Sequence, residues 1–263
     1  MRQKTVTIGL AFLALLACVS CEASSPGAPV APSSAVPFHL VFQPADAAIA
    51  AELEPVLLAG VREVETYFGA PFRAPFRVAI HPDRAAFDAA FPPEWGIAHT
   101  ECWMVASGVA DGVQVLSPRV WKEQACEHDA ADSRHVSELL AHELVHVYHG
   151  QHNPSPDFTA VTGIDWFVEG LATLASGQLA HEHARDAREA LDKGLGPKDL
   201  ATAWSGRYRY GVCGSLVEFL EHELGRERVI RLLGAASSEG LMAAIGMDER
   251  ELLERWRAAV SAK

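Results

Sequence analysis

The sequence is short of positive charge. Its 263 residues include 22 lysines and arginines against 34 aspartates and glutamates, which gives a net charge of −12, and the basic residues form no run. A surface of this sign repels the phosphates of nucleic acids and the headgroups of anionic lipids. We therefore expect no nucleic-acid partner and no membrane contact through a basic surface.

Long hydrophobic runs are also missing. The almost wholly apolar stretch Val6 to Val19 is shorter than the roughly 20 residues that a membrane-spanning helix needs. It follows the positively charged Arg2 and Lys4, an order typical of an export signal. We predict that residues 1–21 are a signal peptide, whose removal leaves 20 basic against 34 acidic residues, a net charge of −14.

The end of this stretch, LALLACVSC, resembles a bacterial lipoprotein box, in which a cysteine after a small residue is lipidated. Cys18 follows Leu-Leu-Ala and Cys21 follows Val-Ser, so both are candidates, with Cys18 narrowly preferred. The resemblance implies an exported cell-envelope lipoprotein that meets the membrane only through an N-terminal lipid anchor. Residues 22–36, rich in proline, serine and alanine, are expected to form an extended tether.

Cysteine is scarce beyond the leader. Only Cys102, Cys126 and Cys213 remain, so at most one disulfide can form within the chain. An exported protein permits such a bond. Because Cys102 and Cys126 both lie in loop-like sequence flanking a strand, we expect these two to pair, although spacing alone leaves the other pairings open.

No internal repeat is visible, and the elements fall into two groups. Alternating, β-branched segments predict strands in the first half, around one helix from residue 45 to 69 with Asp46 as its cap and Pro55 as a kink or late start. Helical periodicity dominates from residue 133 onward. The sequence thus predicts an α+β domain over residues 37–263, with a small sheet packed on the first helix of a helical second half. The predicted strands are Val36–Gln43, Phe76–His81, Trp103–Ala106 and Val113–Ser117, and the later helices Ser133–His149, Ile164–Leu179, Tyr210–Glu223, Arg226–Leu233 and Asp248–Val260.

AHELVHVYHGQH, residues 141–152, holds four histidines and one glutamate. In a helix, His142 and His146 lie four apart on one face, so both imidazoles can reach one cation. Glu143 is one step round the helix, badly placed to bind the cation but well placed to take a proton from a water beside it. An amphipathic helix with two histidines facing a cleft is the alternative. The apolar neighbours favour the metal site, because buried polar groups need partners.

Two residues compete to be the third ligand, and His152 is the first. It stands ten residues after His142, the offset used by metzincins. Metzincins need a glycine where His149 stands, and Gly150 comes one residue late. We therefore expect His149 and His152 to lie at the helix end, where the dipole favours a cationic imidazole, with Gly150 as the C-cap.

The second candidate is Glu169, in WFVEGLA, residues 166–172. This segment resembles the Trp-x-x-Glu-Gly-x-Ala segment of the gluzincin zinc peptidases, and it follows a His-Glu-x-x-His motif as it does in that family. The resemblance implies a zincin-like fold and one zinc ion per chain, held by His142, His146 and Glu169, with Glu143 as the base. An exposed acid on an amphipathic helix is the alternative for Glu169.

Gluzincins often use a later tyrosine or histidine to donate to the oxyanion. In WSGRYRYG, residues 204–211, the resemblance points first to Tyr210 and then to Tyr208 as catalytic residues, and a tyrosine that packs beneath the active helix is the alternative. Arg207 or Arg209 could bind a substrate carboxylate or face water. Some gluzincins carry an acid four residues after the ligand glutamate, but here Thr173 stands there, so a backbone carbonyl, Asp165 or Glu138 must orient the histidines.

The function implied by the resemblance is zinc-dependent hydrolysis of peptide bonds in a peptide or protein substrate. No Gly-x-Met-x-Asn segment of the exopeptidase type precedes the motif, which favours an endopeptidase. The alternative from another class is a non-catalytic, zinc-containing cell-envelope lipoprotein that acts as a binding module.

Overall fold

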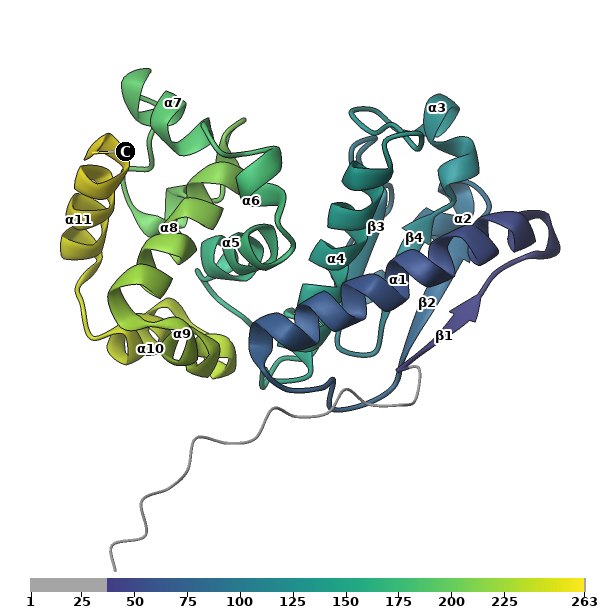
Figure 1. Cartoon of the computed structure of the whole chain (residues 1–263), viewed down its shortest axis with the longest axis horizontal. Helices are drawn as coiled ribbons and strands as arrows, with labels where there is room; N and C mark the ends of the chain where they lie inside the picture. Colours follow the sequence, from purple (N-terminus) through teal and green to yellow (C-terminus); the bar gives the residue numbers. More distant parts are fainter. Residues whose placement is uncertain (1–36, 263) are drawn as a thin grey trace, which may run out of the picture. The chain divides into compact units, whose positions relative to one another are not determined.

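Four strands of the first half build one mixed sheet (Figure 1). The computed structural model describes residues 37–262, so the predicted signal peptide, Cys18, Cys21 and the predicted tether lie outside the described residues. The spatial order is β1-β2-β4-β3, with β1, β2 and β4 parallel and β3 antiparallel at the edge. Their bounds are β1 Phe38–Val41, β2 Phe76–His81, β3 Ala106–Val109 and β4 Gly112–Leu116.

Helix α1, Ala47–Phe68, makes the crossover between the parallel strands β1 and β2. It runs unbroken through Pro55, so the late start considered for it is wrong. Asp46 stands at the N-cap position, but its side chain makes no capping hydrogen bond. It is fully buried and accepts hydrogen bonds from Ser117 Oγ (2.7 Å) and Arg119 Nε (3.0 Å), so it ties α1 to the end of β4 instead.

Helix α4, Ser133–Gly150, lies beside α1 over the sheet and packs directly against β3 (Figure 1). Asp132 caps it by accepting from the backbone N–H groups of Arg134 and His135, both at 3.1 Å. Fourteen of its residues are buried, the motif included. The prediction of a small sheet packed on this helix is confirmed, and the α+β class with it.

The second half of the chain is helical, as predicted. Helix α5, Asp165–Ala175, packs on both α4 and α8, Arg209–Leu224. The predicted helix Ile164–Leu179 is split, because Gly177 adopts a left-handed conformation (φ 89°) between α5 and α6. Within residues 37–262 no helix is long and apolar enough to cross a membrane. The helices here are α5 Asp165–Ala175, α6 Gln178–His181, α7 Asp186–Asp192, α8 Arg209–Leu224, α9 Arg226–Arg231, α10 Ser238–Ile245 and α11 Glu249–Ala262, with the short α2 Arg84–Asp88 and α3 Trp121–Gln124 earlier.

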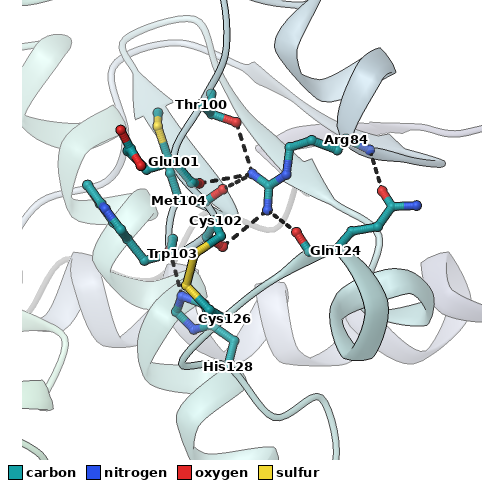
Figure 2. The surroundings of a disulfide bond; sticks show 9 residues. All are labelled: Arg84, Thr100, Glu101, Cys102, Trp103, Met104, Gln124, Cys126 and His128. Atoms are coloured by element: carbon teal, nitrogen blue, oxygen red, sulfur yellow. Dashed lines mark hydrogen bonds between the residues drawn. A yellow bond between two sulfur atoms is a disulfide. The ribbon is translucent and has the colours of Figure 1, made fainter.

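A disulfide joins Cys102 to Cys126, which confirms the predicted pairing, and Cys213 is free and buried. Figure 2 shows the Arg84 guanidinium at the centre of this region, where it donates to the carbonyl oxygens of Glu101, Cys102, Met104 and Gln124. These bonds hold residues 100–104 as an ordered loop. The predicted strand Trp103–Ala106 is therefore wrong, and β3 begins only at Ala106.

Candidate metal centre

Three side chains from two helices converge at the contact of α4 and α5. The Nε2 atoms of His142 and His146 are 3.0 Å apart. Glu169 Oε2 lies 3.3 Å from His142 Nε2 and 3.6 Å from His146 Nε2. Both histidines are buried, and the three residues form a group that could hold a metal ion. Of the two candidates for the third ligand, the structure brings Glu169 to this group.

Gln178, at the start of α6, contacts His142 on the side away from the other two residues. Gln178 Oε1 lies 2.8 Å from His142 Nδ1 and can accept its proton, which would leave Nε2 free to bind a metal ion. Of the orienting residues considered from the sequence, Glu138 pairs with His181 instead. Thr173, which stands in place of the acid, donates its hydroxyl to the carbonyl of Glu169 within α5. Gly177 could have been read as a helix stop, but the local sequence does not show that the residue after it reaches His142.

The charges of the two glutamates differ. Burial raises the pKa of Glu169, but the facing imidazoles of His146 and His142 outweigh this and hold it well below its usual range. Glu143 is buried next to His142 on α4, and burial raises its pKa to about 7, with His142 opposing the rise and Glu169 adding to it. Glu169 is therefore an ionised ligand candidate, whereas Glu143 sits where gaining or losing a proton costs little.

Close packing of β3 on α4 places Glu143. A Cβ atom on Gly108 would lie 2.3 Å from the carbonyl oxygen of Glu143, so only glycine lets the strand approach this far. A backbone hydrogen bond from Gly108 also lowers the pKa of the Glu143 carboxyl, against the effect of burial. Strand β3 thus contacts both the backbone and the carboxylate of the candidate base.

The two candidate tyrosines are separated by the structure. The Tyr210 ring centroid lies 6.1 Å from that of His142, and both residues line a cleft beside the three candidate ligands. Burial raises the pKa of Tyr210, so its hydroxyl keeps its proton and can donate. Tyr208 is buried elsewhere, where its hydroxyl binds Lys193 Nζ (2.7 Å) and Glu189 Oε2 (3.2 Å). Tyr210 is brought to the centre, and Tyr208 is not.

Two hollows that share His142, Glu143 and Tyr210 border the centre and together form the cleft. One of about 430 Å³ includes Arg209, and one of about 320 Å³ includes His146, Glu169 and the strand β3. The walls of the larger hollow come from the disulfide loop, α4, the segment after α6 and the start of α8. One wall carries a hydrogen-bonded chain in which His128 contacts His135 (2.7 Å between Nδ1 and Nε2) and His135 Nδ1–H donates to Glu182 Oε1 (2.8 Å). His128 Nε2–H also donates to the Trp103 carbonyl (2.7 Å; Figure 2). These hydrogen bonds therefore tie the disulfide loop to α4 and to the segment after α6, both of which flank the cleft.

His149 and His152 are not the cations expected from the helix dipole. His149 is fully buried beside the rings of Phe158 and Phe167, and its burial, together with His146, lowers its pKa to about 3. Burial also lowers the pKa of His152. The C-cap prediction for Gly150 is wrong too: α4 includes Gly150 and ends at the right-handed Gln151, and a Cβ on Gly150 would meet the Pro156 carbonyl oxygen at 2.5 Å.

His149 makes stability depend on acid pH. Its folded-state pKa lies below the ordinary value of 6.5, so as the pH falls the unfolded chain takes up the proton first. We expect the free energy of unfolding of metal-free wild type to fall by about 2–3 kcal/mol more than that of His149→Gln between pH 6.5 and pH 4.5. Urea unfolding at each pH measures this. The exposed His39→Gln is the control and should follow wild type, and equal losses in all three proteins would contradict the prediction.

Comparison with protein-family models and with curated proteins finds no match to this chain. The argument for function therefore rests on the residues of the centre and the cleft themselves.

Proposed function

We propose that this protein is a zinc-dependent peptide-bond hydrolase of the gluzincin type, with a zincin-like fold and with endopeptidase action favoured. The observation that carries the proposal is the convergence of His142, His146 and Glu169, from the two predicted motifs, beside Glu143 in a cleft. Neither motif alone is specific, but their meeting at one point would be a coincidence if they served unrelated purposes.

The donor set and its spacing support zinc. Two imidazoles and a carboxylate are the ligands of many catalytic zinc sites. Ligand atoms about 2.0–2.2 Å from a tetrahedral ion are separated by roughly 3.3–3.6 Å. The separations here are 3.0, 3.3 and 3.6 Å, so the side chains need little movement. When bound, zinc supplies a Lewis acid that polarises the scissile carbonyl and makes water more acidic.

The chain's own residues would do the rest. Glu143 would take a proton from the attacking water and pass it to the leaving amine. The Tyr210 hydroxyl, which faces the same cleft, would donate to the developing oxyanion. Gln178 would keep the His142 ring in the ligating tautomer.

The edge strand β3 supports an extended peptide as the substrate. Leu116 N–H donates to the Val105 carbonyl, and with the observed register this makes Ser107 a hydrogen-bonded partner of Gln114. Ala106 then turns its backbone N–H and carbonyl, and Gly108 its carbonyl, to the other edge, where the sheet of the described residues has no further strand; the Gly108 N–H is taken by the Glu143 carboxyl. That edge lines the cleft, so a substrate backbone can pair with it, as an internal stretch of a peptide would.

We also propose that the protein is exported and lipid-anchored at Cys18 or Cys21. The Cys102–Cys126 disulfide supports this, because such bonds persist mainly in oxidising compartments.

Metal analysis and peptide hydrolysis test the proposal together. We expect about one zinc per chain and cleavage of a peptide library that a chelator abolishes and zinc restores. Glu169→Gln should weaken zinc binding by more than the roughly 10–100-fold that loss of an outer-shell partner costs. Glu239→Gln, an exposed acid on α10, is the matched control and should retain zinc. Bound zinc without any cleavage would leave the binding module, and absence of zinc would overturn both functions.

A further inference from the structure

Arg209 is the cation that faces the cleft beside the centre. It is the first residue of α8, it is half-buried, and it lines the same cleft as His142 and Glu143. Other arginines of this protein, such as Arg119 and Arg226, have a carboxylate partner. Within residues 37–262 no carboxylate lies at ion-pair distance from Arg209, although acidic residues outnumber basic ones by 34 to 22 in the chain.

Aromatic rings hold the Arg209 guanidinium in place. Its central carbon lies 4.9 Å from the ring centroid of Trp103, 5.3 Å from that of Trp204 and 5.0 Å from that of Tyr210. One side-chain hydrogen bond joins Arg209 to Tyr210, and the remaining N–H groups of the guanidinium are left for other partners. The guanidinium is a planar fork of donors, which matches a carboxylate with two parallel hydrogen bonds. The rings therefore pre-order the group at little entropic cost to the ligand.

The charges near Arg209 favour an anion. Glu182, on the same cleft, is occupied by His135 at 2.8 Å and also lies 3.9 Å from His183. Glu127 is on the cleft as well but is exposed to solvent. Arg207 also lines this cleft, but it is exposed and its guanidinium lies over the ring of Tyr208, at 4.7 Å from the centroid. A carboxylate that enters here thus meets the Arg209 guanidinium, while Glu182 is already paired.

We propose that Arg209 binds a carboxylate of the substrate, so that the protein prefers peptides with an acidic side chain or a free C-terminal carboxylate close to the scissile bond. The proximity is set by Tyr210, which contacts Arg209 on one side and lies 6.1 Å from the His142 ring on the other. The position relative to a scissile bond rests on the proposed function, but carboxylate binding at Arg209 can be measured without turnover.

Binding is tested with three peptides of one sequence, all N-acetylated. The first carries glutamate at one position and a C-terminal amide, the second has glutamine there, and the third combines glutamine with a free C-terminal carboxylate. Dissociation constants are measured by calorimetry on purified Glu143→Gln, with and without zinc, for glutamate placed at each position in turn. We expect the glutamate or the free-carboxylate peptide to bind about tenfold or more tightly than the glutamine amide, and which of the two does so identifies the source.

Two variants separate carboxylate binding from a structural role. The ratio to follow is the dissociation constant of the glutamine amide divided by that of the preferred carboxylate peptide. Arg209→Gln should bring this ratio close to one. Arg209→Lys should restore it only in part, because lysine keeps the charge without the planar fork of donors. Arg207→Gln is the matched control, since it removes one positive charge from the same wall but leaves the aromatic enclosure, and it should keep most of the ratio. A structural role of Arg209 would weaken all three peptides equally.

The same ratio is then measured as kcat/KM in proteins that carry Glu143. Cleavage without a preference for carboxylate, or a preference that Arg207→Gln removes as fully as Arg209→Gln, overturns the inference and leaves the proposed function standing. Carboxylate-selective binding that depends on Arg209, in a protein that cleaves no peptide, overturns the proposed function and supports Arg209 as a carboxylate site. Absence of both selective binding and cleavage overturns both.

Discussion

Glu143→Gln should lower kcat for peptide hydrolysis by about 10²–10⁴-fold, the range that a general base contributes. The amide has the shape of the carboxylate but cannot take a proton from water. The three candidate ligands are untouched, so the zinc content should stay at about one per chain. Removing a carboxylate that burial and Glu169 both disfavour should leave the free energy of unfolding the same or higher. A loss of activity with these two quantities unchanged assigns the effect to chemistry.

Glu138→Gln is the matched control for that experiment. Glu138 is a buried acid on the same helix, but it pairs with His181 and does not line the cleft. Its substitution should change kcat by less than about tenfold, since no reacting atom is near. Comparable losses in the two variants, or full activity of Glu143→Gln, would remove Glu143 from the mechanism proposed here.

The parts of the centre that could be predicted from the sequence are those fixed by local geometry. The spacing of His142 and His146 puts them on one helical face whatever surrounds them, and Asp132 and the apolar neighbours make that helix form. The strand Phe76–His81 matches the prediction residue for residue, because its apolar run ends at Pro82, and its consecutive residues Val78, Ala79 and Ile80 are all buried. Glu169 was reached through resemblance, and the structure brings it to the two histidines.

What could not be predicted depends on contacts between distant segments. Gln178 reaches His142 because the chain breaks at Gly177; a glycine is a local stop signal, but the direction the chain takes after it is not set by the local sequence. Trp103 was assigned to a strand, although its place is decided by Arg84 and the disulfide, both remote from its own periodicity. His149 was expected to be cationic because of the helix dipole. The dipole stabilises a charge by about 1 kcal/mol at exposed sites, which is less than the free energy needed to bury a charged imidazole fully.

A close contact between α5 and α8 positions one wall of the cleft relative to Glu169. Gly170, next to the candidate ligand Glu169, packs against α8, where a Cβ would lie 2.3 Å from the Cys213 carbonyl oxygen. This close contact holds the start of α8, and with it Arg209 and Tyr210, against the cleft. Gly170 therefore allows the close approach of α5 and α8. The candidate ligand Glu169 and the residue that positions the start of α8 are neighbours on one helix.

Gly108→Ala should damage both stability and activity. The added Cβ would lie 2.3 Å from the Glu143 carbonyl oxygen, and both groups belong to backbone, so no side chain can rotate away. Either β3 or α4 must shift, which we expect to lower the free energy of unfolding by about 1–3 kcal/mol. Because β3 also donates to the Glu143 carboxyl, a shift of about 1 Å should lower kcat/KM by up to roughly 10²-fold.

Gly234→Ala provides the control, since a Cβ there meets no atom within 4 Å. Urea unfolding gives the stability, and kcat/KM on one peptide, measured well below the unfolding transition, gives the activity of the folded fraction. Gly234→Ala should differ from wild type by about 0.5 kcal/mol or less. If Gly108→Ala loses stability yet keeps full activity, the strand positions the helix but not the Glu143 carboxylate. If it loses neither, the close approach of β3 to α4 does not constrain the centre at all. The combined loss is expected because the same strand packs on the backbone of Glu143 and also contacts its carboxylate.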